Sequence, residues 1–371
     1  MSTSAKVVVL DGAEGLSVHN VQLPEPGPYE VIVEQYAAGV CHSQLHNIHA
    51  RPPGAKMLGH ESSGWVVKAG ESVTHVQVGD DVIITWVPRL SGGSTRMPAP
   101  INVELEDGRT ATPATLGVFT WGTHALVDEQ YVVKAPDGMP RDTGSVIGCA
   151  VMTGAGAVVN TAAVPPGSSV AVWGAGGVGL SAIAAARVAG AAKVIAVDID
   201  DAKLEVARRF GATDVINSTK DDPVAAVKAL TTQAGTRNMY GQPFAGADYT
   251  FDCLGRQITF SQAFAAAKTQ RGGTTVLVGV PTDELRLDGI DLLASEKTLL
   301  GSVGGSSVPD RDFPIFVQWN RDGLLDLDSL VTARFSLDQI GDAVADLEAG
   351  KVLGRAILEF TSAGPEARGE F

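Results

Sequence analysis

Cysteine is scarce in this sequence of 371 residues, and the scarcity narrows the class of protein. Cys41, Cys149 and Cys253 are too few for a disulfide scaffold, which predicts a reducing compartment, the cytoplasm. Basic residues are outnumbered as well, with 28 Lys and Arg against 42 Asp and Glu and a formal net charge of −14. Because no basic cluster offsets this charge, a nucleic-acid partner is not expected.

Segments suited to export or to a membrane are lacking too. The N-terminus has no basic start and only four consecutive apolar residues, 7–10, which predict a first strand rather than a signal peptide. Residues 143–186 carry no charge, but Pro165, Pro166 and nine glycines give too many breaks for a spanning helix. We expect a buried seam between two domains there, and no membrane partner.

The length of the chain favours two domains over a single core. Residues up to about 150 read as short β-branched strands separated by turns, at 7–10, 16–21, 30–34, 64–68, 79–85 and 130–134. From about residue 153, strand and helix alternate, which predicts an α/β fold with a parallel sheet covered on both faces. The expected strands are 170–173, 194–197, 248–252 and 275–279, the helices 178–190, 202–210, 223–231 and 259–268, and a helix at 337–348 and a strand at 355–360 follow.

A glycine-rich turn lies at the start of this alternation. Gly174, Gly176 and Gly179 form G-x-G-x-x-G between an apolar strand and an Ala-rich helix, the order that a dinucleotide-binding unit needs. The first glycine permits the turn, the second lets a pyrophosphate approach the backbone, and the third lets helix and strand pack closely. Asp198 ends the next strand, where an acid accepts from both ribose hydroxyls and repels a 2′-phosphate. The pattern therefore predicts NAD rather than NADP, and a merely flexible loop is the alternative.

Three residues among the first 150 could bind a soft divalent metal. Cys41, His60 and Cys149 supply two thiolates and one imidazole, the ligand set of a catalytic zinc site with an open fourth position. A buried cysteine is more often a small core residue, and we expect this for Cys253. The contexts of the other two, in 39–46 and 148–154, favour a metal.

The order, type and spacing of these motifs resemble the zinc-dependent alcohol dehydrogenases of the medium-chain dehydrogenase/reductase superfamily, over nearly the whole chain. The resemblance implies a GroES-like catalytic domain at 1–152, a Rossmann domain at 153–303 and a return to the catalytic domain at 304–371. It implies one catalytic Zn²⁺ per chain, NAD, an alcohol or aldehyde substrate and a homodimer. A zinc-free quinone or enone reductase, or a non-catalytic NAD-binding structural protein, remains an alternative.

The resemblance also assigns residue roles. It implies that Cys41, His60 and Cys149 bind the zinc, that Glu61 assists ligand exchange, and that Ser43 and His46 form a proton relay through the cofactor ribose. Ordinary turn and surface positions are the alternative for these two. Trp86 and Trp121 would line the substrate channel, or belong to the core. The implied cofactor-binding residues are His42, Thr153, Gly174, Gly176, Gly177, Val178, Gly179, Asp198, Lys203, Val278, Gly279, Val280 and Arg355.

The chain departs from the family pattern at three places. The segment 89–117 lacks the four cysteines that hold a second, structural zinc in many relatives. We expect a hairpin there instead, with strand 101–105, a turn at 107–108 and 109–112 pairing back. Gln44 replaces a frequent aspartate, and its amide is expected to accept a weaker hydrogen bond from a histidine ligand. His42 replaces a frequent arginine, so its charge would vary with pH.

Overall fold

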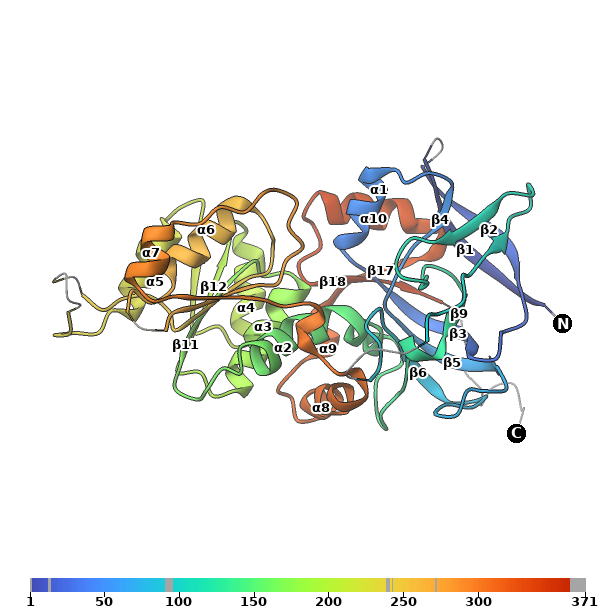
Figure 1. Cartoon of the computed structure of the whole chain (residues 1–371), viewed down its shortest axis with the longest axis horizontal. Helices are drawn as coiled ribbons and strands as arrows, with labels where there is room; N and C mark the ends of the chain where they lie inside the picture. The colour runs from blue at the N-terminus through green and yellow to red at the C-terminus, as the bar shows by residue number, and fades with distance from the viewer. Residues whose placement is uncertain are drawn as a thin grey trace. The chain divides into compact units, whose positions relative to one another are not determined.

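The structure, a computed structural model, describes residues 2–12, 15–90, 96–237, 241, 243–270 and 272–360. It divides into two compact units, coloured along the chain in Figure 1. Unit 1 comprises Met1–Ala150, Val308–Asp322 and Leu327–Phe371, and unit 2 comprises Val151–Ser307 and Gly323–Asp326. The domain boundaries predicted at 152 and 303 stay predictions.

Unit 1 contains two mixed β-sheets. In the larger, β3 lies between strands from both ends of the chain, and all eleven of its residues are buried. The order is β10-β6-β5-β3-β18-β17, with β9 also paired to β3. The bounds are β3(Glu30–Val40), β5(Ser62–Ala69), β6(Asp81–Ile84), β9(His124–Asp128), β10(Val132–Lys134), β17(Val331–Ser336) and β18(Arg355–Glu359).

The second sheet of unit 1 has the order β2-β1-β4-β8-β7. Its strands are β1(Thr3–Asp11), β2(Gly15–Leu23), β4(Ala55–Met57), β7(Val103–Glu104) and β8(Thr110–Pro113). Alternating apolar residues of the two sheets, such as Val7, Ile32, Val66 and Val127, form one buried core. The helices of this unit are α1(Ser43–Ala50), α8(Pro309–Arg321), α9(Leu327–Leu330) and α10(Ile340–Glu348), with short turns at Glu129–Tyr131, Thr143–Val146 and Leu337–Gln339.

The hairpin predicted in the cysteine-free segment is confirmed. Val103 pairs with Ala111 and Glu104 with Thr110, and the turn closes through Leu105 N–H to Arg109 O at 2.8 Å. Gly108 in the turn has φ +80°, a left-handed conformation that glycine adopts without strain. Before the hairpin in the same segment, Arg96 donates two hydrogen bonds to the carboxylate of Asp128, at 2.6 and 2.8 Å. Residues 91–95 lie outside the described part of the segment.

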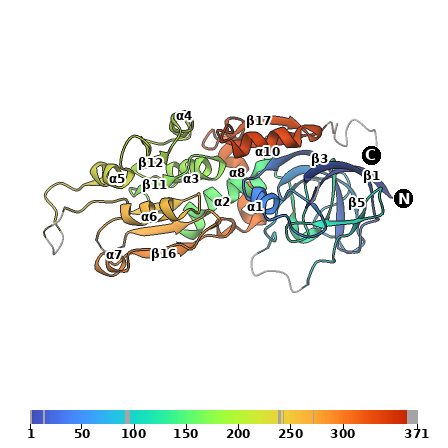
Figure 2. The same ribbon diagram turned by 90° about the horizontal axis from the view of Figure 1, so that it is seen from above.

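Unit 2 is a six-stranded parallel sheet with helices on both faces, as the alternation predicted (Figure 2). The strand order β13-β12-β11-β14-β15-β16 reverses direction of growth between β11 and β14, the switch point at which such sheets bind ligands. The core on one face joins Ala171 and Trp173 of β11 to Val227 of α5 and Ala263 of α6. The strands are β11(Ser169–Trp173), β12(Lys193–Asp198), β13(Asp214–Asn217), β14(Tyr249–Asp252), β15(Thr274–Leu277) and β16(Thr298–Gly301); the helices are α3(Gly177–Val188), α4(Asp201–Arg209), α5(Pro223–Thr231), α6(Gln257–Ala266) and α7(Gly289–Ala294).

A helical run, Thr143–Thr161, corrects one expectation from the sequence. We expected the glycines of 143–186 to break a helix, yet this run of 19 residues is continuous and includes α2(Met152–Gly156). Gly148 and Gly154 are places of close backbone packing, where a Cβ would collide with the carbonyl oxygens of Ile84 and Val178. The run is long and apolar enough to cross a membrane by composition, but 89% of its most apolar window is buried inside the protein, as in a core helix.

Candidate active site

Four buried ligand atoms gather in unit 1. One donor atom from each of Cys41, His60, Glu61 and Cys149 lies within 4.8 Å of the other three. The two sulfur atoms are 3.9 Å apart, and Nε2 of His60 is 3.3 Å from Sγ of Cys149. All four residues are less than a tenth exposed. The arrangement can hold a metal ion.

These distances fit zinc. With zinc–sulfur bonds near 2.3 Å, two thiolates of a tetrahedral site lie about 3.8 Å apart, and a thiolate and an imidazole nitrogen lie about 3.5 Å apart. The observed separations of 3.9 and 3.3 Å are close to both values. Two sulfurs and one nitrogen are also the donors that zinc takes in catalytic sites.

Each ligand is placed by a break in regular structure. Cys41 directly follows β3, at the point where the chain turns into α1. His60 and Glu61 lie between β4 and β5 after Gly59, whose φ of +89° and contact with Trp121 leave no room for a side chain. Cys149 lies in a π-helical turn, Ile147–Val151, a rare geometry that occurs often at functional sites.

The buried charges around the cluster act on its thiols. The pKa of Cys41 lies well below its usual value, because the Cys149 thiol donates a hydrogen bond to it and the Arg355 and His60 charges favour the thiolate, although burial opposes this. The pKa of Cys149 is raised by the same hydrogen bond and by burial. The hydrogen bond and the nearby charges thus favour the thiolate form of Cys41, the form that binds a metal.

Glu61 and Arg355 form a buried ion pair beside the cluster. Nε of Arg355 donates to Oε1 of Glu61 at 2.9 Å, and its Nη2 also contacts that oxygen. The other carboxylate oxygen accepts from Ala150 N–H at 3.3 Å. Burial raises the pKa of Glu61, while the Arg355 charge opposes the shift. The guanidinium expected to hold a pyrophosphate is thus engaged by a carboxylate at two of its nitrogens.

Gln44 contacts His60 differently from our expectation. Its amide oxygen accepts from Gly59 N–H at 2.9 Å, and its amide nitrogen lies 2.8 Å from Nδ1 of His60. The amide nitrogen therefore faces the imidazole, whereas the sequence suggested the amide oxygen. The backbone of Gly59 occupies the oxygen, which is the physical reason for the difference. Because a histidine that binds zinc through Nε2 carries its proton on Nδ1, the amide must present its oxygen to the ring when zinc is bound.

The predicted relay residues lie on α1. Ser43 is the first residue of the helix, and its Oγ–H donates to Sγ of Cys41 at 3.1 Å. His46 is half-buried one turn later, and neither of its ring nitrogens has a hydrogen-bond partner among the described residues. His42 is the exposed N-cap residue of the same helix. Of the three, Ser43 contacts the cluster directly, and His42 and His46 lie within three residues of it along the chain.

The two tryptophans have different surroundings. Trp86 is half-buried and packs edge-on against the His60 ring, with ring centroids 6.4 Å apart and an interplanar angle of 74°. Trp121 is 1% exposed, lies in the core with Val8, Leu45 and Leu58, and donates from its indole N–H to Gly39 O at 3.1 Å. The contacts favour a site position for Trp86 and the core interpretation for Trp121.

The glycine-rich turn of unit 2 has the geometry of a phosphate cradle. Gly174 has φ +90°, Gly176 is the N-cap of α3, and a Cβ on Gly179 would collide with Gly174 O. A Cβ on Gly176 would meet nothing within 4 Å, so the space beside this backbone is open. Gly177 and Val178 form the first turn of α3, where unpaired N–H groups favour anions.

Asp198 joins the end of β12 to this turn. Its carboxylate accepts from Ala175 N–H at 2.7 Å, Ile199 N–H at 2.8 Å and Asp200 N–H at 3.1 Å. The acid is therefore oriented before any ribose binds. Of the remaining predicted residues of unit 2, Lys203 lies half-buried on α4, Thr153 is buried in α2, and 278–280 follow β15.

Two apolar residues of unit 2 escaped the sequence reasoning. Ile199 follows β12 and is 69% exposed, and Leu254 follows β14 and is 46% exposed. A Cβ on Gly174 would touch Leu254, so this side chain covers the turn. The sequence signal for both residues was their position: each is an apolar residue just after the carboxyl end of a strand near the switch point, where ligands bind.

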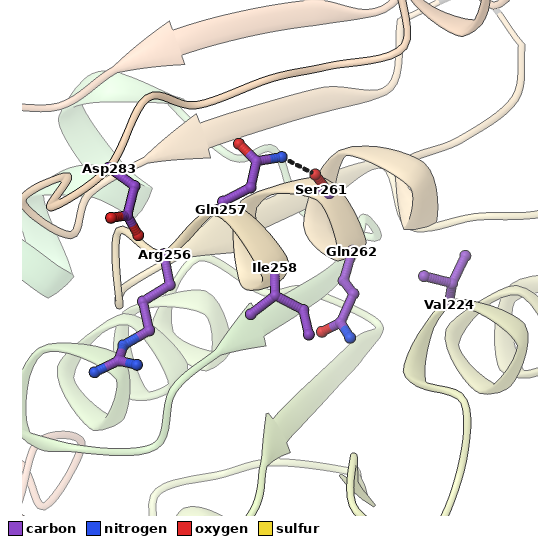
Figure 3. Close-up of a pocket in the computed structure, with 7 residues that line it drawn as sticks. All are labelled: Val224, Arg256, Gln257, Ile258, Ser261, Gln262 and Asp283. Atoms are coloured by element: carbon purple, nitrogen blue, oxygen red, sulfur yellow. Dashed lines mark hydrogen bonds between the residues drawn. The ribbon is translucent and has the colours of Figure 1, made fainter.

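A pocket of about 530 Å³ opens between α5 and α6 in unit 2 (Figure 3). Val224 of α5 faces Ile258 and Gln262 of α6 across it, and Arg256 and Asp283 form its other end. Gln257 is fixed by its amide, which donates to Ser261 Oγ at 2.6 Å. The pocket contains none of the candidate metal ligands.

Comparisons with known proteins agree with both units. Residues 27–137 match the family model of the alcohol dehydrogenase GroES-like domain, and 177–321 match that of the zinc-binding dehydrogenases. The chain is 31% identical to the alcohol dehydrogenase class-3 of Cereibacter sphaeroides, over 97% of this chain and 100% of the relative.

Solved structures are similar over the same length. An alcohol dehydrogenase zinc-binding domain protein from Burkholderia ambifaria has a TM-score of 0.86 and 31% identity, covering 98% of this chain and 100% of that one. The benzyl alcohol dehydrogenase of Acinetobacter calcoaceticus has a TM-score of 0.82 and 30% identity, covering 97% and 100%.

Proposed function

Since this chain belongs to the zinc-dependent alcohol dehydrogenases of the medium-chain dehydrogenase/reductase superfamily, we propose that Cys41, His60 and Cys149 hold its catalytic zinc ion. The proposal is supported above all by the four buried ligand atoms within 4.8 Å of one another. The enzyme interconverts alcohols with aldehydes or ketones, using a nicotinamide cofactor. When bound, zinc supplies a Lewis acid that lowers the pKa of an alcohol hydroxyl.

The residues around the ligands prepare the site for this chemistry. Glu61 keeps a carboxylate beside the ligands, and Arg355 balances the charge of that carboxylate. Glu61 can therefore assist ligand exchange without repelling the alcohol. Trp86 packs against His60 and limits the ring's rotation. Gln44 fixes the same ring from its Nδ1 side.

Ser43 and His46 are proposed to remove the hydroxyl proton. A serine hydroxyl both accepts and donates, so Ser43 can pass a proton without changing its own charge. His46 can then take it, because imidazole is the side chain that titrates near neutral pH and this ring has no competing partner among the described residues.

Unit 2 is proposed to bind NAD. The cofactor, when bound, supplies the hydride acceptor. The turn at 174–179 would hold its pyrophosphate, and Asp198 would accept from the adenosine ribose and repel a 2′-phosphate. We place the adenine between Ile199 and Leu254, which are exposed apolar residues after β12 and β14, with Leu254 beside Gly174 of that turn.

Replacing a ligand tests the zinc assignment. In Cys41→Ser we expect alcohol-dependent NADH formation to fall to background and zinc to drop from about one ion per chain towards none, because the thiolate pair is broken. NAD affinity should persist, since the turn belongs to unit 2. Cys253→Ser is the matched control and should keep zinc and turnover. Near wild-type turnover in a metal-free Cys41→Ser protein would contradict the proposal.

We also propose a homodimer in the cytoplasm. β16 ends the sheet of unit 2 as an edge strand, and three of its four residues are exposed. Ile290, Leu293 and Leu299 are exposed apolar side chains on or beside this edge. A second copy that pairs its own β16 here would satisfy the free backbone groups and cover the apolar residues.

A further inference from the structure

Helix α1 carries a row of proton-transfer groups that extends past the relay already proposed. Ser43, His46 and His49 recur at every third residue of this helix. Residues three apart in an α-helix are neighbours on one face, with Cβ atoms about 5 to 6 Å apart. Each step of three residues shifts by about 60° around the helix, so the row winds along α1 from Ser43, beside the metal cluster, to His49 in the last turn, and only consecutive members are neighbours.

The end of this row is an imidazole–carboxylate pair. Nε2 of His49 lies 2.6 Å from Oε1 of Glu348, the last residue of α10, and the two side chains are 65% and 41% exposed. Asp11 and Arg51 line a pocket of about 390 Å³ with His49, and Asp11 is itself paired with Arg109. Glu348 is thus the acid that contacts His49 directly.

The pair is not needed to hold α1 against α10. Leu45 of α1 is buried in the same core cluster as Ile340, Ala343 and Val344 of α10, with Ile48 packed against it. An exposed ion pair adds little to stability. Apolar packing, rather than the His49–Glu348 contact, joins the two helices.

We propose that His49 and Glu348 form the outlet through which the substrate proton leaves the protein. The proposal rests on the proposed function of the Ser43–His46 relay and extends it to the surface. His46 passes its proton to Nδ1 of His49 through water, because no hydrogen bond joins the two rings among the described residues, and Nε2–H of His49 is held by the carboxylate. The protonated pair then releases the proton to bulk buffer. This imidazole is the outlet because it is the exposed member of the row.

The reaction balances along this path. An alcohol loses a hydride to NAD⁺ and a hydroxyl proton to the relay, which gives a carbonyl product, NADH and one proton. The hydroxyl O–H bond breaks as an N–H bond forms on His46, and that proton appears in solution from His49. In aldehyde reduction, the proton enters in the opposite direction.

Single-turnover NADH formation in dilute buffer at pH 6.5 to 7.5 tests the outlet. For the wild type we expect a rate independent of buffer concentration. For His49→Gln we expect a rate lowered about three- to tenfold, restored by added imidazole and close to wild type near pH 9. Glu348→Gln should show a smaller loss of the same kind. His19→Gln, which removes an imidazole that contacts Ser17 outside this row, is the matched control and should behave as wild type.

The outcomes separate the outlet from other roles. A purely structural pair would lower the melting temperature of His49→Gln and give a loss that neither pH nor imidazole changes, which would overturn the proposal. A buffer-dependent loss in His46→Gln without one in His49→Gln would end the relay at His46, and would also overturn it. A wild type without alcohol oxidation would instead refute the proposed function.

Discussion

Asp198 is the residue that we propose to decide between NAD and NADP. Its carboxylate is fixed by three backbone N–H groups at the phosphate turn, so a 2′-phosphate would meet an oriented negative charge. In Asp198→Gly we expect the ratio of kcat/KM for NADP to that for NAD to rise about tenfold or more, since like charges in contact cost several kcal/mol.

Asp198→Asn is the companion variant, because it removes the charge but can keep an oxygen towards the turn. It should shift the ratio in the same direction with less loss of NAD affinity. An unchanged ratio in both variants would mean that another residue reads the ribose.

Asp252 makes the stability of the folded protein depend on pH. It is fully buried at the end of β14, where its Oδ1 accepts from Leu254 N–H and Thr259 Oγ1–H, while Oδ2 has no hydrogen-bond partner among the residues that the structure describes. Burial raises the pKa of this carboxyl above its ordinary value, although those hydrogen bonds oppose the shift. The folded state therefore favours the neutral acid, and the stability it contributes at low pH is lost as pH rises through the folded pKa.

We expect Asp252→Asn to melt at a higher temperature than the wild type at pH 7 to 8, because the amide keeps an acceptor oxygen without the charge. The difference should shrink as pH falls towards 4, where the wild-type carboxyl is neutral in both states. Thermal melts across this range measure it, with Asp248→Asn as the control. The pKa of Asp248 is lowered by Ser169 and Lys268 despite partial burial, so this control should give the opposite sign.

At the residue scale, the sequence predicted which side chains could bind a metal better than it predicted their hydrogen-bond and ion-pair partners. The trio Cys41, His60 and Cys149 could be predicted because few side chains bind zinc and their local contexts stood out. The Glu61–Arg355 pair could not, since 294 residues separate its members and nothing local indicates the contact. The orientation of the Gln44 amide could not be predicted either, because it depends on the backbone N–H of Gly59, fifteen residues away.

At the scale of elements, two glycines of one turn have different functions. A Cβ on Gly179 would collide with Gly174 O, whereas a Cβ on Gly176, whose φ of −85° suits any residue, would meet nothing within 4 Å. We expect Gly179→Ala to lose about 1 to 3 kcal/mol of stability or to misfold, because helix and strand must separate. Gly176→Ala should melt like the wild type but bind NAD at least about tenfold more weakly, since the methyl group fills the space for pyrophosphate.

Chemical denaturation and NAD titration of both variants measure these effects. Gly341→Ala, in α10 with nothing near its Cβ, is the control for adding a methyl group to a glycine elsewhere. Equal NAD affinity for Gly176→Ala and the wild type would contradict the proposal that this turn binds the pyrophosphate.

Local patterns predicted the elements that short-range chemistry determines. The helix at 223–231 begins after an Asp222 cap and starts with Pro223, and the structure has these same bounds. The hairpin at 103–113 followed from its turn residues. The helical run Thr143–Thr161 was misread, because glycines that close tertiary packing cannot be told from glycines that end a helix without knowing their neighbours.

At the scale of the whole molecule, the exposed edge of unit 2 predicts the oligomeric state. We expect light scattering to give a dimer for the wild type and a shift towards monomer for Leu299→Lys, since a charge on the edge strand opposes pairing. Ile315→Lys is the matched control, because Ile315 is 43% exposed against 41% for Leu299 but lies on α8 of unit 1. A dimer unaffected by Leu299→Lys would place the interface elsewhere.

The strand β18 imposes an order of events on synthesis. Arg355 begins this strand and neutralises Glu61 beside the metal ligands, yet the ribosome adds it 294 residues later. At about 5 to 20 residues per second, Glu61 waits roughly 15 to 60 s for its counter-charge. During that delay all of Val151–Ser307 has emerged and can collapse on its own parallel sheet, while β3 still lacks β18 as a neighbour. The nucleotide-binding unit can thus be finished first, and the proposed metal site is completed only after β18 has been made.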